Sequence, residues 1–147
     1  MLRPLVRYTI DASVFVNAFM PHELGHEASS AFLRHVRGER ITTIVPTLAL
    51  AEVAATVARI RNDAPGARAF AELIARLPDL ALVALGVPLM WESVDVAARY
   101  RLRGSDAVYA AVALKHGAVL VTRDSEMRQR LVGIVTVHTP EEALALL

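Results

Sequence analysis

The sequence predicts an α/β protein built on a parallel sheet of five strands with helices between them. Two observations support this fold class. Short runs rich in Val, Ile and Leu alternate with longer segments whose apolar residues recur at helical spacing. The short runs also lack polar alternation, which is typical of strands covered on both faces. At 147 residues the chain can bury a core of its own, and we expect residues 1–147 to form a single domain.

The expected elements follow one another along the chain. The strands are predicted at residues 6–10, 41–45, 80–84, 118–122 and 134–138. Helix starts are predicted at Pro46-Thr47, Ser105 and Thr139-Pro140. Helix ends are predicted at Gly38, Gly104 and Gly117. The most loop-like segment is residues 61–67, and we expect it to form a turn between two helices.

Four carboxylates stand at the borders of apolar runs, where an isolated charge is costly to bury. They are Asp11, Glu52, Asp106 and Asp124. Two of them follow the first and fourth strands, and the other two fall in the first turns of helices, so one edge of a parallel sheet could gather all four. Taken singly, Asp106 is equally well explained as a helix-start residue and Asp124 as a turn acid. The coincidence of four favours a shared cation site.

Composition excludes several classes of function. Hydrophobic residues make up 54% of the chain, but no apolar run approaches the roughly 20 residues that a membrane helix needs. Asp11 interrupts the only apolar run near the N-terminus, so no signal-peptide pattern is present and we expect a cytoplasmic protein. The absence of cysteine excludes disulfides, thiolate metal sites and cysteine nucleophiles.

Four ordered stretches of the chain together resemble the PIN-domain family, and most closely its VapC-type toxin ribonucleases. They are Asp11–Ala18, Pro46–Val53, Gly104–Ala111 and Leu120–Asp124. Each stretch is short, but all four occur in the family's order and rough spacing and together extend over nearly the whole chain. The resemblance implies a three-layer α/β/α fold with a five-stranded parallel sheet.

The resemblance also implies a function and a set of site residues. The chain would be a divalent-metal-dependent endoribonuclease, the toxin of a type II toxin–antitoxin pair, with RNA as substrate, a small cognate antitoxin as partner and a homodimer as its assembly. The four carboxylates would bind the metal and catalyse hydrolysis, and Ser13 and Thr122 would orient them. Oxygen ligands without cysteine favour Mg²⁺ or Mn²⁺ over Zn²⁺. The sequence does not decide whether one or two metal ions bind, or which carboxylate activates the water.

Arginines near the acids have two interpretations. Arg103, Arg123 and Arg128 flank Asp106 and Asp124, and they could form a rim that contacts RNA phosphates. The alternative is a solvated helix face. The net charge of only +1 provides no overall basic field that would decide between the two.

Two other functions compete with the ribonuclease. One is a non-catalytic PIN-like module that binds RNA or a protein. The other is a zinc metalloprotease, because His22–His26 (sequence His-Glu-Leu-Gly-His) matches H-E-x-x-H, with His22 and His26 as ligands and Glu23 as base. The extended protease motif fails at Ser29 and Phe32, and Pro21 favours an exposed helix start for this segment.

Overall fold

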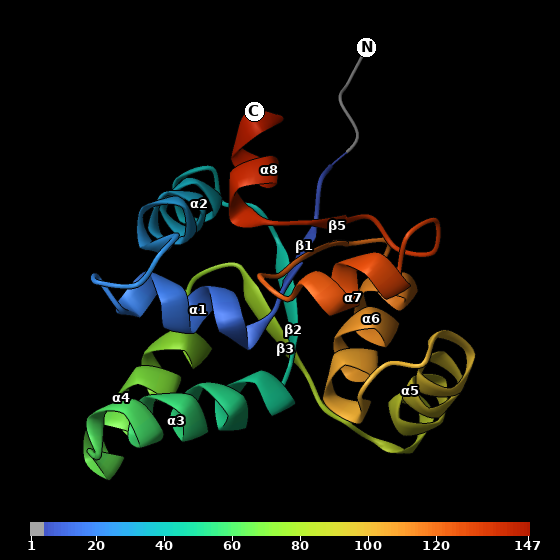
Figure 1. Cartoon of the computed structure of the whole chain (residues 1–147), viewed down its shortest axis with the longest axis horizontal. Coiled ribbons are helices and arrows are strands. Elements are labelled where there is room, and N and C mark those ends of the chain that lie inside the picture. Colours follow the sequence, from blue (N-terminus) through green and yellow to red (C-terminus); the bar gives the residue numbers. More distant parts are fainter. Residues whose placement is uncertain (1–4) are drawn as a thin grey trace.

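The computed structural model describes residues 5–147 and has a parallel five-stranded sheet at its centre. The strands are β1 (Tyr8–Ile10), β2 (Thr43–Pro46), β3 (Leu80–Val83), β4 (Val119–Val121) and β5 (Val137–His138). They lie in the order β3-β2-β1-β4-β5 (Figure 1). All five predicted strands are confirmed with different bounds, since β2 extends to Pro46, one residue beyond the predicted run, and β5 has only two of its five predicted residues. The order puts β1 in the middle, with β2 and β4 on either side.

Helices fill every connection between the strands. They are α1 (Ala12–Phe19), α2 (His26–Gly38), α3 (Leu48–Arg61), α4 (Ala64–Ala75), α5 (Val87–Tyr100), α6 (Gly104–His116), α7 (Ser125–Arg130) and α8 (Pro140–Ala145). Figure 1 shows the strands between α1, α2 and α4 on one side and α5 and α6 on the other. The three-layer arrangement implied by the family resemblance is therefore confirmed.

Several helix boundaries differ from the prediction. Gly104 does not end a helix: α5 ends earlier, with Arg101 in the left-handed conformation at φ 55°, and Gly104 is the first residue of α6. Leu102, which follows Arg101, is buried, and this apolar anchor stabilises a helix end without glycine. The turn predicted at 61–67 is shorter, because the Asp63 side chain accepts a hydrogen bond from the Gly66 N–H and already caps α4.

Other boundaries follow the sequence signals. Gly117 ends α6 in the left-handed conformation at φ 60°. Thr139 begins α8 with a capping box, in which its hydroxyl accepts from the Glu142 N–H and the Glu142 carboxylate accepts from the Thr139 N–H. Strong local signals of this kind depend on neighbouring residues alone.

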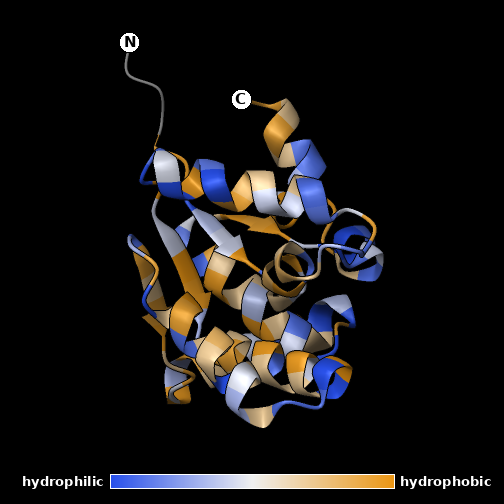
Figure 2. Ribbon diagram, turned by 90° about the vertical axis from the view of Figure 1, so that its left-hand side faces the viewer, coloured by the Kyte–Doolittle hydropathy of each residue, from blue (hydrophilic) through white to orange (hydrophobic). Residues whose placement is uncertain are grey.

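The core lies on both faces of the sheet. Figure 2 shows apolar residues running through the strands and the helices beside them. On one face Tyr8 meets the ring of Phe32 from α2 edge-on, at 5.0 Å between ring centroids. On the other face α6 packs on β1, β2 and β4, and its residues 107–113 are all buried. Among residues 5–147, no helix is long and apolar enough to cross a membrane.

Candidate active site

The four carboxylates line one pocket of about 500 Å³ at the carboxyl edge of the sheet. Asp11 follows β1 and precedes α1, and Asp124 follows β4 and precedes α7. Glu52 lies in the first turns of α3, and Asp106 lies in the first turn of α6. The side chains thus come from four elements that are distant in the sequence, and the parallel sheet brings them together at one edge.

Asp11 is held by two hydroxyl groups. The Ser13 and Thr122 hydroxyls each donate a hydrogen bond of 2.7 Å to the same oxygen, Oδ2. Thr122 reaches Asp11 because β1 and β4 pair in register, Ile10 beside Val121, so the next residues of both strands are neighbours. Asp11 is only 8% exposed, and burial raises the pKa of its carboxyl, whereas the two hydroxyls lower it.

Glu52 is oriented by a buried tyrosine. The Tyr109 hydroxyl donates a 2.6 Å hydrogen bond to Glu52 Oε1 and accepts one of 3.3 Å from the Ala12 N–H. Burial raises the pKa of Tyr109, so the phenol stays protonated and remains a donor. Burial also raises the pKa of Glu52, partly offset by the Tyr109 hydrogen bond.

The sequence analysis did not name Tyr109 among the site residues and missed its polar contacts. One signal could have found them. Tyr109 stands three residues after Asp106 in the same helix, and residues at that spacing share a face.

Asp106 differs from the other acids, because no hydrogen bond reaches its carboxylate from residues 5–147. Burial and the charges of Asp124 and Asp11 raise its pKa to about 6, against a lowering by Arg103. The carboxylate therefore resists ionisation as long as no cation is close.

Asp124 does two things in this structure. Its Oδ1 atom accepts hydrogen bonds from the N–H groups of Glu126 and Met127, at 2.9 and 3.3 Å, and so caps α7. Its carboxylate also lines the pocket beside Asp106. The turn-acid interpretation of this residue is therefore confirmed, and its role in a metal site stays a prediction that its place in the pocket allows.

Three of the acids share one pattern, which is that protein donors hold one carboxylate oxygen and no described residue bonds the other. The free oxygens are Asp11 Oδ1, Glu52 Oε2 and Asp124 Oδ2. Outer hydrogen bonds of this kind are typical of oriented metal ligands, and an all-oxygen donor set fits Mg²⁺ or Mn²⁺. Between residues 5 and 147, no three acidic or imidazole side chains are close enough to enclose one ion directly, so an ion bound here would keep water molecules among its ligands.

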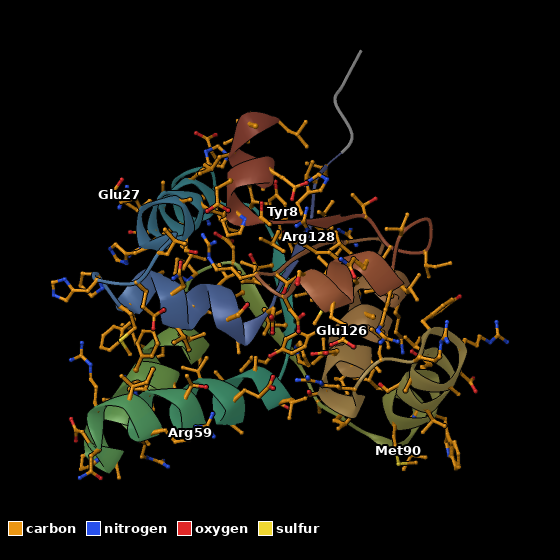
Figure 3. The ribbon with its side chains drawn as sticks, in the orientation of Figure 1. Tyr8, Glu27, Arg59, Met90, Glu126 and Arg128 are labelled. Atoms are coloured by element: carbon orange, nitrogen blue, oxygen red, sulfur yellow. The ribbon has the colours of Figure 1, made fainter. Side chains whose placement is uncertain are left out.

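The three arginines near the site are used differently. Arg123 also lines the pocket, and its guanidinium donates to Ser29 Oγ, Gly25 O and Glu141 Oε1, each at 2.7 Å, so it ties these segments together. Arg128 pairs with Glu142 and does not line the pocket. Arg103 lines the pocket and is 77% exposed, with only a 3.9 Å contact to Glu126. Figure 3 shows Glu126 on the α7 side of this contact.

The H-E-x-x-H segment does not form the helix that a zinc protease needs. His22 and Glu23 lie in turns, and α2 begins only at His26. The Asn17 side-chain amide donates to Glu23 Oε2 at 3.3 Å, and His26 Nδ1 lies 3.0 Å from the Asn17 carbonyl oxygen. Both groups therefore serve local structure, as the exposed helix-start interpretation predicts.

A comparison with protein-family models matched residues 8–130 to the PIN domain. The chain belongs to the PIN-domain family. All four carboxylates of this PIN domain lie within the matched range. The prediction that residues 1–147 form a single domain stays a prediction. A comparison with curated proteins gave no match.

Solved structures share the fold of this PIN domain at low identity. VapBC2 from Rickettsia felis bound to a DNA fragment from its promoter is 13% identical, with a TM-score of 0.70 over 91% of this chain and 98% of that one. PAE2754 from Pyrobaculum aerophilum is 24% identical, with a TM-score of 0.67 over 97% and 89%. Mycobacterium tuberculosis VapC20, described as a sarcin-ricin-loop-cleaving toxin, is 14% identical, with a TM-score of 0.69 over 83% and 93%.

Proposed function

We propose that this PIN domain is a divalent-metal-dependent endoribonuclease that hydrolyses RNA phosphodiester bonds. The observation that carries the proposal is the pocket, because Asp11, Glu52, Asp106 and Asp124 reach it from four elements of a PIN fold. Four carboxylates in one partly buried pocket are costly to ionise together, because burial first and the neighbouring charges second raise the pKa of Asp106. A structure that keeps such a cluster gains most from a cation that neutralises it.

The chain's own residues divide the work at this site. Asp11, Glu52 and Asp124 would hold Mg²⁺ or Mn²⁺ through their free oxygens, and Asp106 would complete the set. A bound ion supplies Lewis-acid charge for the scissile phosphate and for an attacking water. Ser13, Thr122 and Tyr109 keep the carboxylates oriented, and Arg103 would contact a phosphate at the rim.

The same proposal makes the protein a cytoplasmic toxin that a small antitoxin inhibits, and a homodimer. It is supported by the structural neighbours, which include a toxin–antitoxin complex from Klebsiella pneumoniae. The alignment with that complex covers 90% of this chain and 97% of the matched chain. A dimer needs an apolar surface, and residues 48–75 and helix α5 both expose apolar side chains. More exposed apolar side chains lie together on α5, namely Val87, Met90, Trp91 and Val94, so this helix is the better candidate surface.

One observation favours the second candidate, a non-catalytic PIN module. In the part of the chain from residue 5 onward, no three acids are gathered closely enough to enclose an ion. A module of this kind would bind RNA or a protein without needing metal. It predicts RNA binding that is unchanged by EDTA.

RNA cleavage with matched variants tests the proposal. Wild type should cut RNA in Mg²⁺ or Mn²⁺ and not in EDTA. Asp106→Asn should lose roughly 100-fold or more in rate, because it removes one charged ligand without changing size. Asp95→Asn, on the exposed side of α5, is the control and should cut normally. Full activity of Asp106→Asn would overturn the assignment of this pocket as the active site. RNA binding by wild type without any metal-dependent cleavage would favour the non-catalytic module.

A further inference from the structure

The pocket continues beyond the four acids, along the groove between α1 and α3. Glu52, Thr56 and Ile60 line it from successive turns of α3, so the far end lies roughly 12 Å along the helix from Glu52. Val16 of α1 faces the same groove. Ile60 is 53% exposed there, an apolar side chain left uncovered in a pocket otherwise rich in charge. We call this part of the pocket, lined by Val16 and Ile60, the arm. Its apolar side chains offer a surface on which a flat ring could pack.

Glu23 also lines the pocket, and a hydrogen bond from a buried side chain holds its carboxylate. Its Oε2 atom accepts from the Asn17 amide, which also donates to the Leu24 carbonyl oxygen at 3.0 Å. Asn17 is only 5% exposed, and its Oδ1 atom accepts from Ser29 Oγ at 2.7 Å. The buried Asn17 thus fixes one oxygen of Glu23, while Oε1 accepts no hydrogen bond from residues 5–147. An ionised carboxylate can only accept hydrogen bonds.

The lining of the pocket carries charges of both signs. Arg103 lines the pocket near Asp106, and Glu23 and Ile60 line it as well. Arg123 is also part of the lining, but its guanidinium is already bonded to Gly25, Ser29 and Glu141. A phosphate would be repelled by Glu23 and attracted by Arg103. An RNA base is flat, uncharged and largely apolar on its faces. Such a ring suits the part of the pocket lined by Ile60.

We propose that the arm, together with Glu23, is a subsite for one unpaired RNA base next to the cleaved phosphate. Glu23 accepts a hydrogen bond from the exocyclic amino group of cytosine, adenine or guanine. Uracil offers only N3–H, which lies between two carbonyl oxygens that repel the carboxylate, so uracil is bound less well. Unstacked bases are read in this way in sequence-specific RNA recognition. The inference rests on the proposed ribonuclease function and adds its nucleotide preference.

Sequencing the cut sites in a random single-stranded RNA pool tests the subsite. Wild type should disfavour uridine at one position flanking the cut, by roughly 5- to 100-fold. In Glu23→Gln the amide can also donate to the uracil O4 atom, so this discrimination should fall to within about twofold. Glu27→Gln, on the outer side of α2 (Figure 3), is the matched control and should keep the wild-type preference.

A second variant separates the apolar wall from the hydrogen bond. Ile60→Ala should raise KM by roughly tenfold and leave base preference unchanged, because it removes only apolar contact. Val132→Ala, an exposed valine outside the pocket, should change neither quantity. Melting temperatures check that each variant is folded.

The possible results separate the subsite from the ribonuclease. Cutting with equal use of all four nucleotides, or an unchanged preference in Glu23→Gln, overturns the subsite and leaves the ribonuclease intact. Absence of cutting by wild type overturns the proposed function. Fluorescence anisotropy with labelled oligocytidine and oligouridine then decides the subsite, since equal binding of the two by wild type overturns it and a Glu23-dependent preference for oligocytidine supports it.

Discussion

At the scale of single residues, the site depends on hydroxyl groups as much as on acids. The hydroxyls of Ser13, Thr122 and Tyr109 each donate to a pocket carboxylate and accept from a backbone N–H. Each therefore fixes the direction of a carboxylate relative to the strand ends. A carboxylate whose rotamer is fixed has less conformational entropy to lose when it binds a cation.

Removing one hydroxyl should weaken the affinity of the site for metal without unfolding the protein. In Tyr109→Phe, Glu52 Oε1 and the Ala12 N–H lose their partner, so the free energy of unfolding should fall by about 1 kcal/mol. The Mg²⁺ concentration for half-maximal RNA cleavage should rise about tenfold.

The control for this prediction is Tyr100→Phe. Tyr100 lies on α5, outside the pocket, and no hydrogen bond of its hydroxyl joins it to residues 5–147. Its substitution should leave the metal titration unchanged. An unaltered Mg²⁺ requirement in Tyr109→Phe would show that Glu52 needs no orienting partner.

At the scale of elements, Arg123 ties three parts of the chain together. Its guanidinium joins the turn at Gly25, the first turns of α2 through Ser29, and α8 through Glu141. Sequence reasoning placed this arginine at an RNA-contacting rim, because an arginine beside an acid is ambiguous until its partners are known. Those partners are nearly 100 residues away in the chain for Gly25 and Ser29, and no local pattern reveals them.

The Gly25 turn offers a test of this bridge. Gly25 has φ +84°, and a Cβ atom there would lie 2.5 Å from Arg123 Nη1. Gly25→Ala should lower the free energy of unfolding by about 1–2 kcal/mol from the left-handed backbone alone, with a further loss as Arg123 is displaced. Urea denaturation measures the change.

Gly38→Ala is the matched control at the other end of α2. Gly38 ends α2, has open space around its Cα and does not have a positive φ. Alanine favours a helix over glycine, so stability should be equal or higher by up to about 1 kcal/mol. If Gly25→Ala behaved in the same way, Arg123 would not be a tight bridge.

At the scale of the whole molecule, the acid cluster links folding to pH and to metal. The pKa of Asp106 is about 6 in the fold against an ordinary value of 3.8. Between these values the folded state keeps a proton that the unfolded chain releases, so the contribution of Asp106 to stability falls as pH rises from about 4 to 6. Burial and the neighbouring charges of Asp124, Asp11 and Glu52 cause the shift.

A melting-temperature series should show this linkage. Without divalent metal, wild type should lose a few degrees of Tm relative to Asp106→Asn as pH rises from 4 to 7. Mg²⁺ should raise the Tm of wild type at pH 7 more than at pH 5, because it binds the ionised acids of the folded state. A Tm that is the same with and without Mg²⁺ at pH 7 would contradict a cation site in this pocket.

The sequence by itself determined the strands, most helix ends and the gathering of the four acids at one edge of the sheet. These depend on apolar runs, cap residues and the meeting of parallel strand ends, all of which are local or follow from topology. The tertiary structure decided the rest. Tyr109 finds Glu52 across 57 residues, Arg123 turns to Ser29 across 94, and Asn17 aims Glu23 into the groove. Such pairings depend on how distant elements pack against one another. Local sequence patterns therefore do not predict them.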